Sequence, residues 1–201
     1  MKKHIISISL FFMTMVFVSC LNQSSKQERT ALAAEEDQQM QLAKQDTIRG
    51  SIPSEAKGRV GSTNISINYH APGVKGRILW GGLVPYDQVW VTGAHMATRL
   101  EFDSDLLIGG QKVPAGKYAL FTIPGREEWT VIINKNWEQH LTDEYDQQED
   151  ILRLQVKPTV LQHHQERLRY EINEFSEGEG AINISWDKLM VVLPVKITSW
   201  K

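Results

Sequence analysis

The sequence predicts an all-β domain, an antiparallel β-sandwich of the jelly-roll-like or immunoglobulin-like kind. Two observations support this prediction. From Gly58 to the C-terminus, short runs of alternating apolar and polar residues follow one another, separated by Gly and Pro turns. In the same part of the chain, no long segment has the spacing of an amphipathic helix, and no internal repeat is present.

The first strand signals lie between residues 65 and 134. Ile65, Ile67 and Tyr69 alternate with polar neighbours, which is typical of a strand with one buried face. Gly109-Gly110 stands between two short apolar runs and predicts a tight hairpin, because glycine adopts a positive φ without strain. The run "KYALFTI" at 117–123 is apolar on both faces, so it is expected in the centre of a sheet, and "EWTVIIN" at 128–134 is expected to follow it.

The second half of the domain alternates more regularly. Leucine, valine, tyrosine, isoleucine and tryptophan occupy every second position in residues 152–157, 167–173 and 182–186. A last strand is expected at residues 190–197. Pro194 lies in it and cannot donate a backbone hydrogen bond, so it indicates a sheet edge or a bulge.

The N-terminus has the features of a secretory signal. Lys2 and Lys3 precede an apolar run at residues 5–18, which is shorter than the roughly 20 residues that a membrane-spanning helix needs. Cys20, the only cysteine, follows directly and resembles the acylated cysteine of a bacterial lipoprotein. We therefore expect a signal peptide at residues 1–19 and a lipid on Cys20. Because Leu21 is not aspartate, we expect an outer-membrane protein that faces the periplasm.

Residues 20–57 are rich in Gln, Glu, Ala, Lys and Ser, with few large apolar side chains. This composition predicts a flexible or partly helical tether, so the β-sandwich domain is expected to occupy residues 58–201. The formal net charge of −2 gives no reason to expect a nucleic-acid partner, which would need a clustered basic face. With Cys20 acylated, no disulfide can form.

Known catalytic and cofactor motifs are missing, and no cofactor is expected. The sequence has no nucleophile elbow, no phosphate-binding loop and no dinucleotide fingerprint. No two histidines have the spacing that places them on one face of a helix or strand, so no metal site is predicted. His70 and His95 are the exception that folding could bring together, because each ends or follows an expected strand.

The stretch "GRILWGGLVPYDQVWVTGAHMAT", residues 76–98, has no steady period. One interpretation is a ligand-binding wall, with flat apolar rings and a few polar contacts. Its residues would be Trp80, Tyr86 and Trp90 as surfaces, and Arg77, Thr92 and His95 as hydrogen-bonding groups. The other is a core loop, in which the tryptophans close one end of the sandwich and Arg77 pairs with a carboxylate.

Three classes of function follow from these features. The first is an envelope lipoprotein that binds a small molecule, a glycan or a peptide through residues 76–98. The second is a hydrolase in which His95 works with a carboxylate such as Asp87 or Glu101. The third is a structural accessory subunit, held to an envelope complex by pairing at a sheet edge.

The same stretch carries a family resemblance. "APGVKGRILWGGLVPYDQVWVTGAHMATRLEF" followed by "VPAGKYALFTIPGREEWTVIIN" resembles an uncharacterised family of secreted and lipid-anchored bacterial envelope proteins, domain of unknown function 2911. The resemblance covers residues 58–197 and implies an all-β envelope protein without assigning an activity, cofactor or partner. The family usually has Arg and Asn where this chain has Val91 and His95, so a shared ligand is not assumed.

Overall fold

The structure is a computed structural model that describes residues 48–198. Residues Ile48–Lys201 form a compact unit of their own. The expected signal peptide at residues 1–19, the lipidated Cys20 and residues 20–47 of the expected tether lie outside the described residues. Within residues 48–198, the only helical element is a 3-10 turn at Gln147–Glu149, and no helix there is long and apolar enough to cross a membrane.

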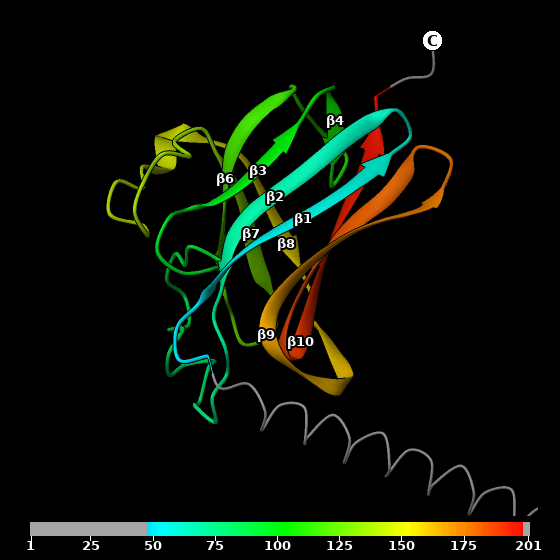
Figure 1. Ribbon diagram of the computed structural model, residues 1–201. Helices are drawn as coiled ribbons and strands as arrows, with labels where there is room; N and C mark the ends of the chain where they lie inside the picture. The colour runs from blue at the N-terminus through cyan, green and yellow to red at the C-terminus, as the bar shows by residue number, and fades with distance from the viewer. Residues whose placement is uncertain (1–47, 199–201) are drawn as a thin grey trace, which may run out of the picture. The chain divides into compact units, whose positions relative to one another are not determined.

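The described residues build two antiparallel sheets, as the alternation in the sequence predicts (Figure 1). The six-stranded sheet has the order β1-β2-β3-β6-β7-β8, and the four-stranded sheet has the order β5-β4-β10-β9. The strands are β1 (Ile52–Val60), β2 (Thr63–Ala71), β3 (Thr98–Phe102), β4 (Leu106–Ile108), β5 (Gln111–Val113), β6 (Gly116–Ile123), β7 (Trp129–Asn134), β8 (Asp150–Val156), β9 (Thr159–Ser176) and β10 (Glu179–Ile197). The prediction of an all-β sandwich is confirmed.

Two local predictions are also confirmed. Gly109 and Gly110 have φ values of 56° and 84° and join β4 to β5, with Ile108 opposite Gln111. β6 lies inside the six-stranded sheet between β3 and β7, which explains why its residues are apolar on both faces.

Regular structure starts at Ile52, inside the segment expected to be part of the tether. Between Ile52 and Val60, β1 turns the small residues Ser54, Ala56 and Gly58 inward, so its hydrophobic period is weak in the sequence. A Cβ on Gly58 would lie 2.6 Å from the Cβ of Ile172, so the missing side chain lets β1 approach β9 closely. Figure 1 shows β1 passing beside β9 at this side of the sandwich.

The last two expected strands are one continuous strand, β10 (Glu179–Ile197). Asp187 has a φ of 54°, and the register against β9 shifts on both sides of it. The strand therefore bends there without ending, which the interrupted hydrophobic pattern did not indicate. Pro194 lies beyond the residues paired with β9 and just before those paired with β4, so its missing donor interrupts neither ladder.

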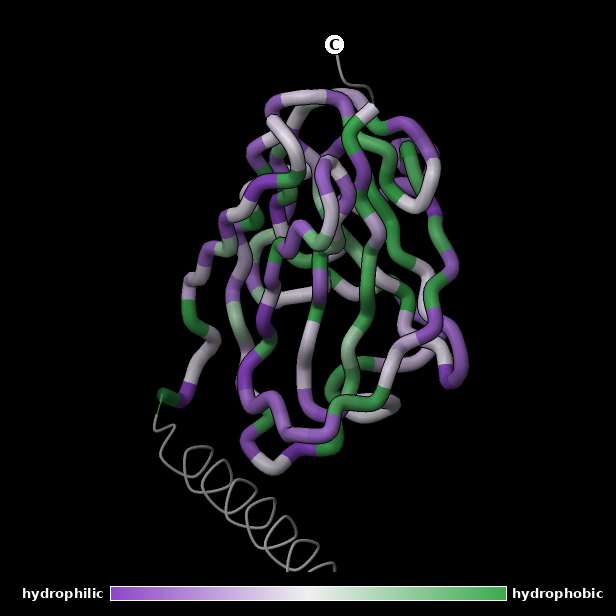
Figure 2. Tube along the Cα trace, turned by 90° about the vertical axis from the view of Figure 1, so that its right-hand side faces the viewer, coloured by the Kyte–Doolittle hydropathy of each residue, from purple (hydrophilic) through white to green (hydrophobic). Residues whose placement is uncertain are grey.

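The main core lies between the two sheets, where fully buried side chains include Ile67, Leu100 and Leu120. Figure 2 shows the alternation behind it, with hydrophilic and hydrophobic segments following one another along the strands. A smaller cluster occupies the opposite, outer face of the six-stranded sheet, formed by Val91, Ala97, Ala119, Phe121 and Ile132. Trp137 and Tyr145 of the β7–β8 connection pack on this second cluster, so the connection rises as a wall beside the outer face.

Candidate functional site

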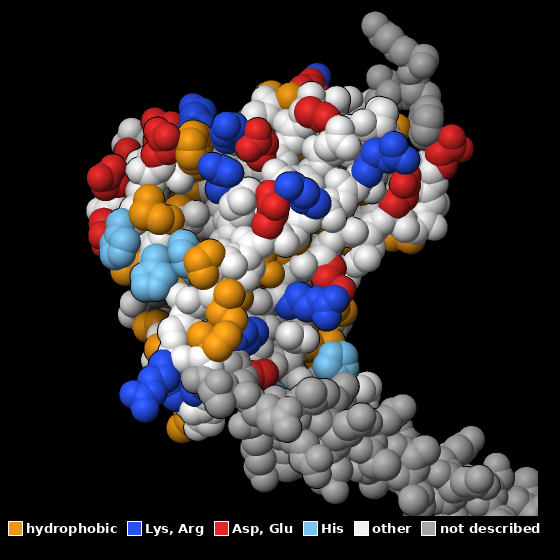
Figure 3. Space-filling view, viewed as in Figure 1, with side chains coloured by type: hydrophobic (Ala, Val, Ile, Leu, Met, Phe, Trp, Pro, Cys, Tyr) orange, Lys and Arg blue, Asp and Glu red, His pale blue; other side chains and the backbone are white. Residues whose placement is uncertain are grey.

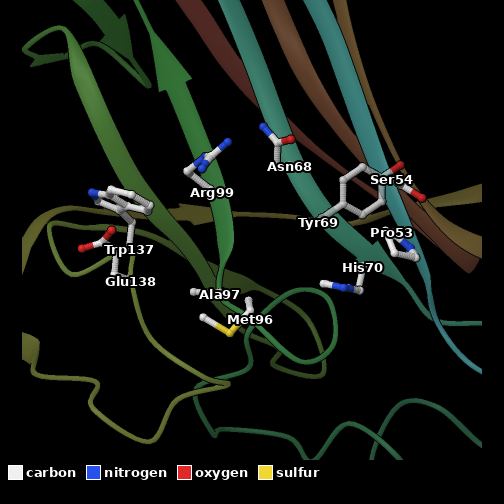
Figure 4. Close-up of a pocket in the computed structure, with 10 residues that line it drawn as sticks. All are labelled: Pro53, Ser54, Asn68, Tyr69, His70, Met96, Ala97, Arg99, Trp137 and Glu138. Carbon is white, nitrogen blue, oxygen red and sulfur yellow. The ribbon is translucent and has the colours of Figure 1, made fainter.

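A depression of about 500 Å³ lies on the outer face of the six-stranded sheet (Figure 4). It is open to solvent and bounded by β1 and β2 on one side and by the β7–β8 connection on the other. Its lining residues are Pro53, Ser54, Asn68, Tyr69, His70, Met96, Ala97, Arg99, Trp137 and Glu138. This volume lies within the range of small-molecule binding sites, about 300–1,000 Å³.

Strand alternation places the polar groups of the depression. On β2, Ile67 and Tyr69 are buried toward the other sheet, so Asn68 and His70 project from the opposite face. On β3, Arg99 precedes the buried Leu100 and stands directly opposite Asn68 in the ladder. Adjacent strands therefore bring an amide, an imidazole and a guanidinium to one surface.

The guanidinium of Arg99 is the group in the depression whose hydrogen bonding is least satisfied. Its Nε is buried without a hydrogen-bond acceptor, and the nearest carboxylate oxygen, on Glu101, lies 4.0 Å away. Within residues 48–198 its only other polar contact is with the ring of Trp137, whose centroid lies 5.5 Å from Cζ. A buried donor without an acceptor costs free energy, about 1–3 kcal/mol, and a ligand oxygen at this position would remove that cost.

Trp137 forms the opposite wall, and hydrogen bonds at its base fix the segment that carries it. The Oδ1 of buried Asn134 accepts from the backbone of Asn136 at 2.9 Å, and Gln139 donates from Nε2 to the carbonyl of Asn136 at 2.7 Å. The Nζ of Lys117 also lies 5.5 Å from the Trp137 ring. The result is an aromatic ring held in place beside two cations.

His70 and His95 meet at the edge of the depression. Their ring centroids lie 5.0 Å apart, and the rings are nearly perpendicular at 78°. Burial, with the nearby charge of His95 as a second cause, holds the pKa of His70 below its ordinary value. His95 is exposed and has a φ of 63°, between Ala94 and Met96. The sequence left open that folding could bring these two histidines together, and the structure places their rings in contact.

Trp80 and Trp90 of the predicted ligand wall pack against two further tryptophans. The centroid of Trp80 lies 4.8 Å from that of Trp129, and Trp90 stacks on Trp186 at 5.6 Å with an 18° interplanar angle. The space among these rings is about 10 Å³, which is no larger than one water molecule needs. The two rings are therefore arranged as the core-loop interpretation expects, at one end of the main core.

Two polar members of the predicted wall hold the backbone. Arg77 donates from Nε to the carbonyl of Val74 and from Nη2 to that of Gly73, at 3.1 and 2.6 Å, where the core-loop interpretation expected a carboxylate. Thr92 is fully buried, and its hydroxyl lies 2.9 Å from that of Thr122.

Tyr86 lies under the guanidinium of Arg126, whose Cζ is 4.7 Å from the ring centroid. Of the six residues predicted to bind a ligand, only His95 lies next to the depression. The ligand-binding role of the six stays a prediction.

The arrangement of His95 bears on the hydrolase alternative. Within residues 48–198 its ring makes no hydrogen bond to Asp87 or Glu101. Glu101 instead lies near Lys117 and Arg99, at 3.8 and 4.0 Å. The acid–base pair that this alternative requires is not assembled in the structure.

Among the residues of the depression that the sequence analysis did not single out are Asn68, Arg99, Trp137 and Glu138. The sequence does hold one signal for them. Asn68 and Arg99 are polar positions in strands that alternate apolar and polar residues, which marks the solvent face of a sheet. Nothing in the sequence shows that the segment carrying Trp137 folds back over that face.

A second polar cluster lies at the bend of β9 and β10, away from the depression. His164 contacts Asp187 through Nδ1 at 3.0 Å and Glu166 through Nε2 at 3.1 Å. Glu166 also accepts from the backbone of Lys75 at 3.0 Å, and the indole of Trp186 donates to the Glu166 carbonyl at 3.3 Å. This cluster fastens the start of the 76–98 stretch to β9, beside the four tryptophans.

No three His, Cys, Asp or Glu residues within 48–198 are arranged to hold a metal ion. The fold and the site geometry thus define an all-β domain with a polar, aromatic-walled depression on the outer face of one sheet.

The chain belongs to the family described as "Protein of unknown function (DUF2911)", whose profile matches residues 51–195. The resemblance seen in the sequence is confirmed. No curated protein and no solved structure matches the chain.

Proposed function

We propose that this protein is a binding module whose depression takes a small acidic saccharide. The observation that carries the proposal is Arg99, which lines the depression and whose Nε has no hydrogen-bond acceptor, the carboxylate of Glu101 lying 4.0 Å away. A carboxylate on a sugar ring accepts from a guanidinium in a bidentate fashion. Such a ligand would supply the oxygen atoms that Arg99 lacks.

The remaining walls suit the rest of a saccharide. Trp137 offers an apolar ring beside Arg99, and aromatic rings with a few hydrogen-bonding groups commonly bind sugars. Asn68, His70 and Glu138 lie within the same depression and offer an amide, an imidazole and a carboxylate for hydroxyl groups. Figure 4 shows these side chains around one hollow, with Trp137 facing the strands that carry Arg99 and Asn68.

Binding is favoured over the two alternative functions. A hydrolase would need His95 in contact with an acid, and its ring instead contacts the ring of His70 edge to face. A purely structural subunit would present a flat apolar face without a concave site. The depression on the outer sheet face is concave and has polar groups on several sides.

We also propose that the protein is a lipoprotein held at the outer membrane on its periplasmic side through Cys20. The support is the order of a basic start, a short apolar run and a single cysteine. More than one acyl chain is needed for stable anchoring, which the bacterial lipoprotein modification supplies. Metabolic labelling with an alkyne fatty acid tests this, because Cys20→Ser should abolish the label.

The binding proposal is tested by thermal unfolding of the chain from Leu21 onward, which keeps the whole compact unit Ile48–Lys201. The probes are oligomers of glucuronate and galacturonate, with neutral gluco-oligosaccharides and tripeptides for comparison. A ligand at 100 times its Kd should raise the free energy of unfolding by about 2.7 kcal/mol.

Arg99→Met and Trp137→Ala should remove this stabilisation. Arg169→Met, on the exposed face of β9, should keep it. The proposal is wrong if no acidic saccharide stabilises the wild type, if neutral sugars or peptides do so equally, or if both depression variants keep the effect.

A further inference from the structure

We propose a Cu(I) site at the edge of the depression, formed by the imidazoles of His70 and His95 and the thioether of Met96. This inference shares His70 with the saccharide proposal but does not depend on it, because the principal sugar contacts are assigned to Arg99 and Trp137. It rests on the geometry of two imidazoles, on their free nitrogen atoms and on the neighbouring sulfur.

The separation of the two imidazoles suits a shared ion. Their ring centroids lie 5.0 Å apart. With metal–nitrogen bonds of about 2.0 Å, two imidazoles on one tetrahedral ion have ring centroids about 5 Å apart. The backbone therefore already holds the rings at a separation at which both can bind the same ion.

The nitrogen atoms of both rings are free to bind. Within residues 48–198, neither His70 nor His95 makes a side-chain hydrogen bond, and their one shared interaction is the ring contact. An imidazole binds a metal through a deprotonated nitrogen, so protons compete with the ion.

Met96 supplies the donor that selects the metal. Its side chain is 47% exposed, it follows His95 directly, and it lines the depression together with His70. A thioether is a soft ligand that favours Cu(I), whereas structural zinc sites take additional nitrogen, oxygen or thiolate donors. Within residues 48–198, no third His, Cys, Asp or Glu joins this pair in an arrangement that could hold a metal ion, which argues for Cu(I) over zinc.

The backbone around Met96 fixes it in this place. The amide of Ala97 donates to the carbonyl of Gln139 at 2.9 Å, and the amide of Leu141 donates to that of His95 at 2.6 Å. The two hydrogen bonds flank a single antiparallel β-bridge between Met96 and His140, and residues paired in this way lie directly opposite each other. Figure 3 shows histidine side chains gathered beside apolar ones on this face of the molecule.

The experiment uses the chain from Leu21 onward without a histidine tag, so that neither the only thiol nor added imidazoles compete for the ion. Cu(I), kept reduced by ascorbate under nitrogen, is titrated in competition with the chromophoric chelator bicinchoninate. We expect one Cu(I) per chain. His70→Gln and His95→Gln should each lower the affinity at least about tenfold, as loss of a metal-site residue commonly does.

Two further variants test whether Cu(I) binding depends on the proposed site and not on histidines in general. Met96→Leu keeps the apolar volume, so it should lower Cu(I) affinity and remove the sulfur contribution from the copper X-ray absorption spectrum. His163→Gln, an exposed histidine on β9, should bind Cu(I) like the wild type. Near-UV circular dichroism of the metal-free variants checks that they fold.

The proposal is overturned if the wild type takes no Cu(I) from the chelator. It is also overturned if the double variant His70→Gln/His95→Gln, folded by its near-UV spectrum, keeps the wild-type affinity.

Discussion

The hydroxyl of Tyr170 on β9 donates a hydrogen bond of 2.7 Å to the backbone carbonyl of Thr92 in the interior. Tyr170 is 3% exposed and Thr92 is fully buried, so the bond joins β9 to the irregular 76–98 stretch across the core. The stretch lacks a regular period, yet interior contacts of this kind fix its course. Its polar residues are in part structural for this reason.

Tyr170→Phe removes this hydrogen bond while keeping the ring. The free energy of unfolding should fall by about 1 kcal/mol, because the Thr92 carbonyl keeps its second donor, the Thr98 hydroxyl at 3.0 Å. Tyr86→Phe, whose hydroxyl makes no hydrogen bond within residues 48–198, should change stability by less than about 0.5 kcal/mol. Urea unfolding followed by circular dichroism measures both, and equal effects would contradict the assigned role of the Tyr170 hydroxyl.

The packing of the four tryptophans predicts that Trp186→Ala lowers the free energy of unfolding much more than Trp137→Ala does. Trp186 is 2% exposed and stacks on Trp90, so Trp186→Ala should cost about 3–5 kcal/mol of unfolding free energy. Trp137→Ala, at the half-buried wall of the depression, should cost clearly less. If urea unfolding gives both variants the same loss, the assignment of Trp186 to the core and Trp137 to the site is wrong.

Tyr145 predicts a loss of stability in alkaline solution. Burial, followed by its hydrogen bond to Asp150, raises the pKa of Tyr145 to about 12. In the unfolded chain the pKa is about 10, so only the unfolded state ionises between the two values, and stability falls as the pH rises through this window. Urea unfolding at pH 9 and pH 11 should show a smaller decrease for Tyr145→Phe than for the wild type. If stability decreases equally in the wild type and in Tyr145→Phe, groups other than Tyr145 cause the decrease.

The pair His70 and His95 predicts that the protein loses stability in acid, whereas Tyr145 predicts a loss in alkali. The pKa of His70 is lowered in the folded protein, so the unfolded chain binds a proton first and stability falls as the pH drops below about 6.5. His95→Gln removes the smaller of the two causes and should move the pKa of His70 upward. Histidine ring signals in a ¹H–¹³C NMR titration measure this, and a downward movement would contradict the account.

The cluster at the bend of β9 and β10 is expected to hold the loop that precedes Arg77. Glu166→Gln weakens the contact with His164 and the bond from the Lys75 backbone, so stability should fall by about 1–2 kcal/mol. Glu127→Gln, at an exposed position, serves as the matched control and should have little effect. If Glu166→Gln and Glu127→Gln have equal stabilities, the structural role assigned to this cluster is wrong.

Regular alternation made most of the sheets predictable. β2, β6 and β7 follow from the spacing of their apolar residues, and the β4–β5 hairpin follows from Gly109-Gly110. The start of β1 was missed because its inward positions carry small side chains such as Ala56. The continuity of β10 was missed because Asp187 interrupts the pattern, although the strand only bends there.

The site was harder to predict than the fold, for a physical reason. Its residues come from β1, β2, β3, the end of the 76–98 stretch and a connection about 40 residues further along the chain, and only folding brings them together. Periodicity places Asn68 and Arg99 on the solvent face, but it carries no information about where Trp137 folds back. The tryptophans Trp80 and Trp90 drew attention because they lie in an irregular stretch, and the structure shows them packed with Trp129 and Trp186.

The central claim is that the ligand occupies the depression beside Trp137 and does not contact Trp80 and Trp90 of the 76–98 stretch. The chain has six tryptophans, and each indole N–H gives its own signal in a ¹H–¹⁵N NMR spectrum, assignable by substitution. On titration with a galacturonate trimer, the signal of Trp137 should move most, while those of Trp80 and Trp90 should stay in place. Movement of the Trp80 and Trp90 signals with Trp137 unchanged, or no movement at all, would contradict the account.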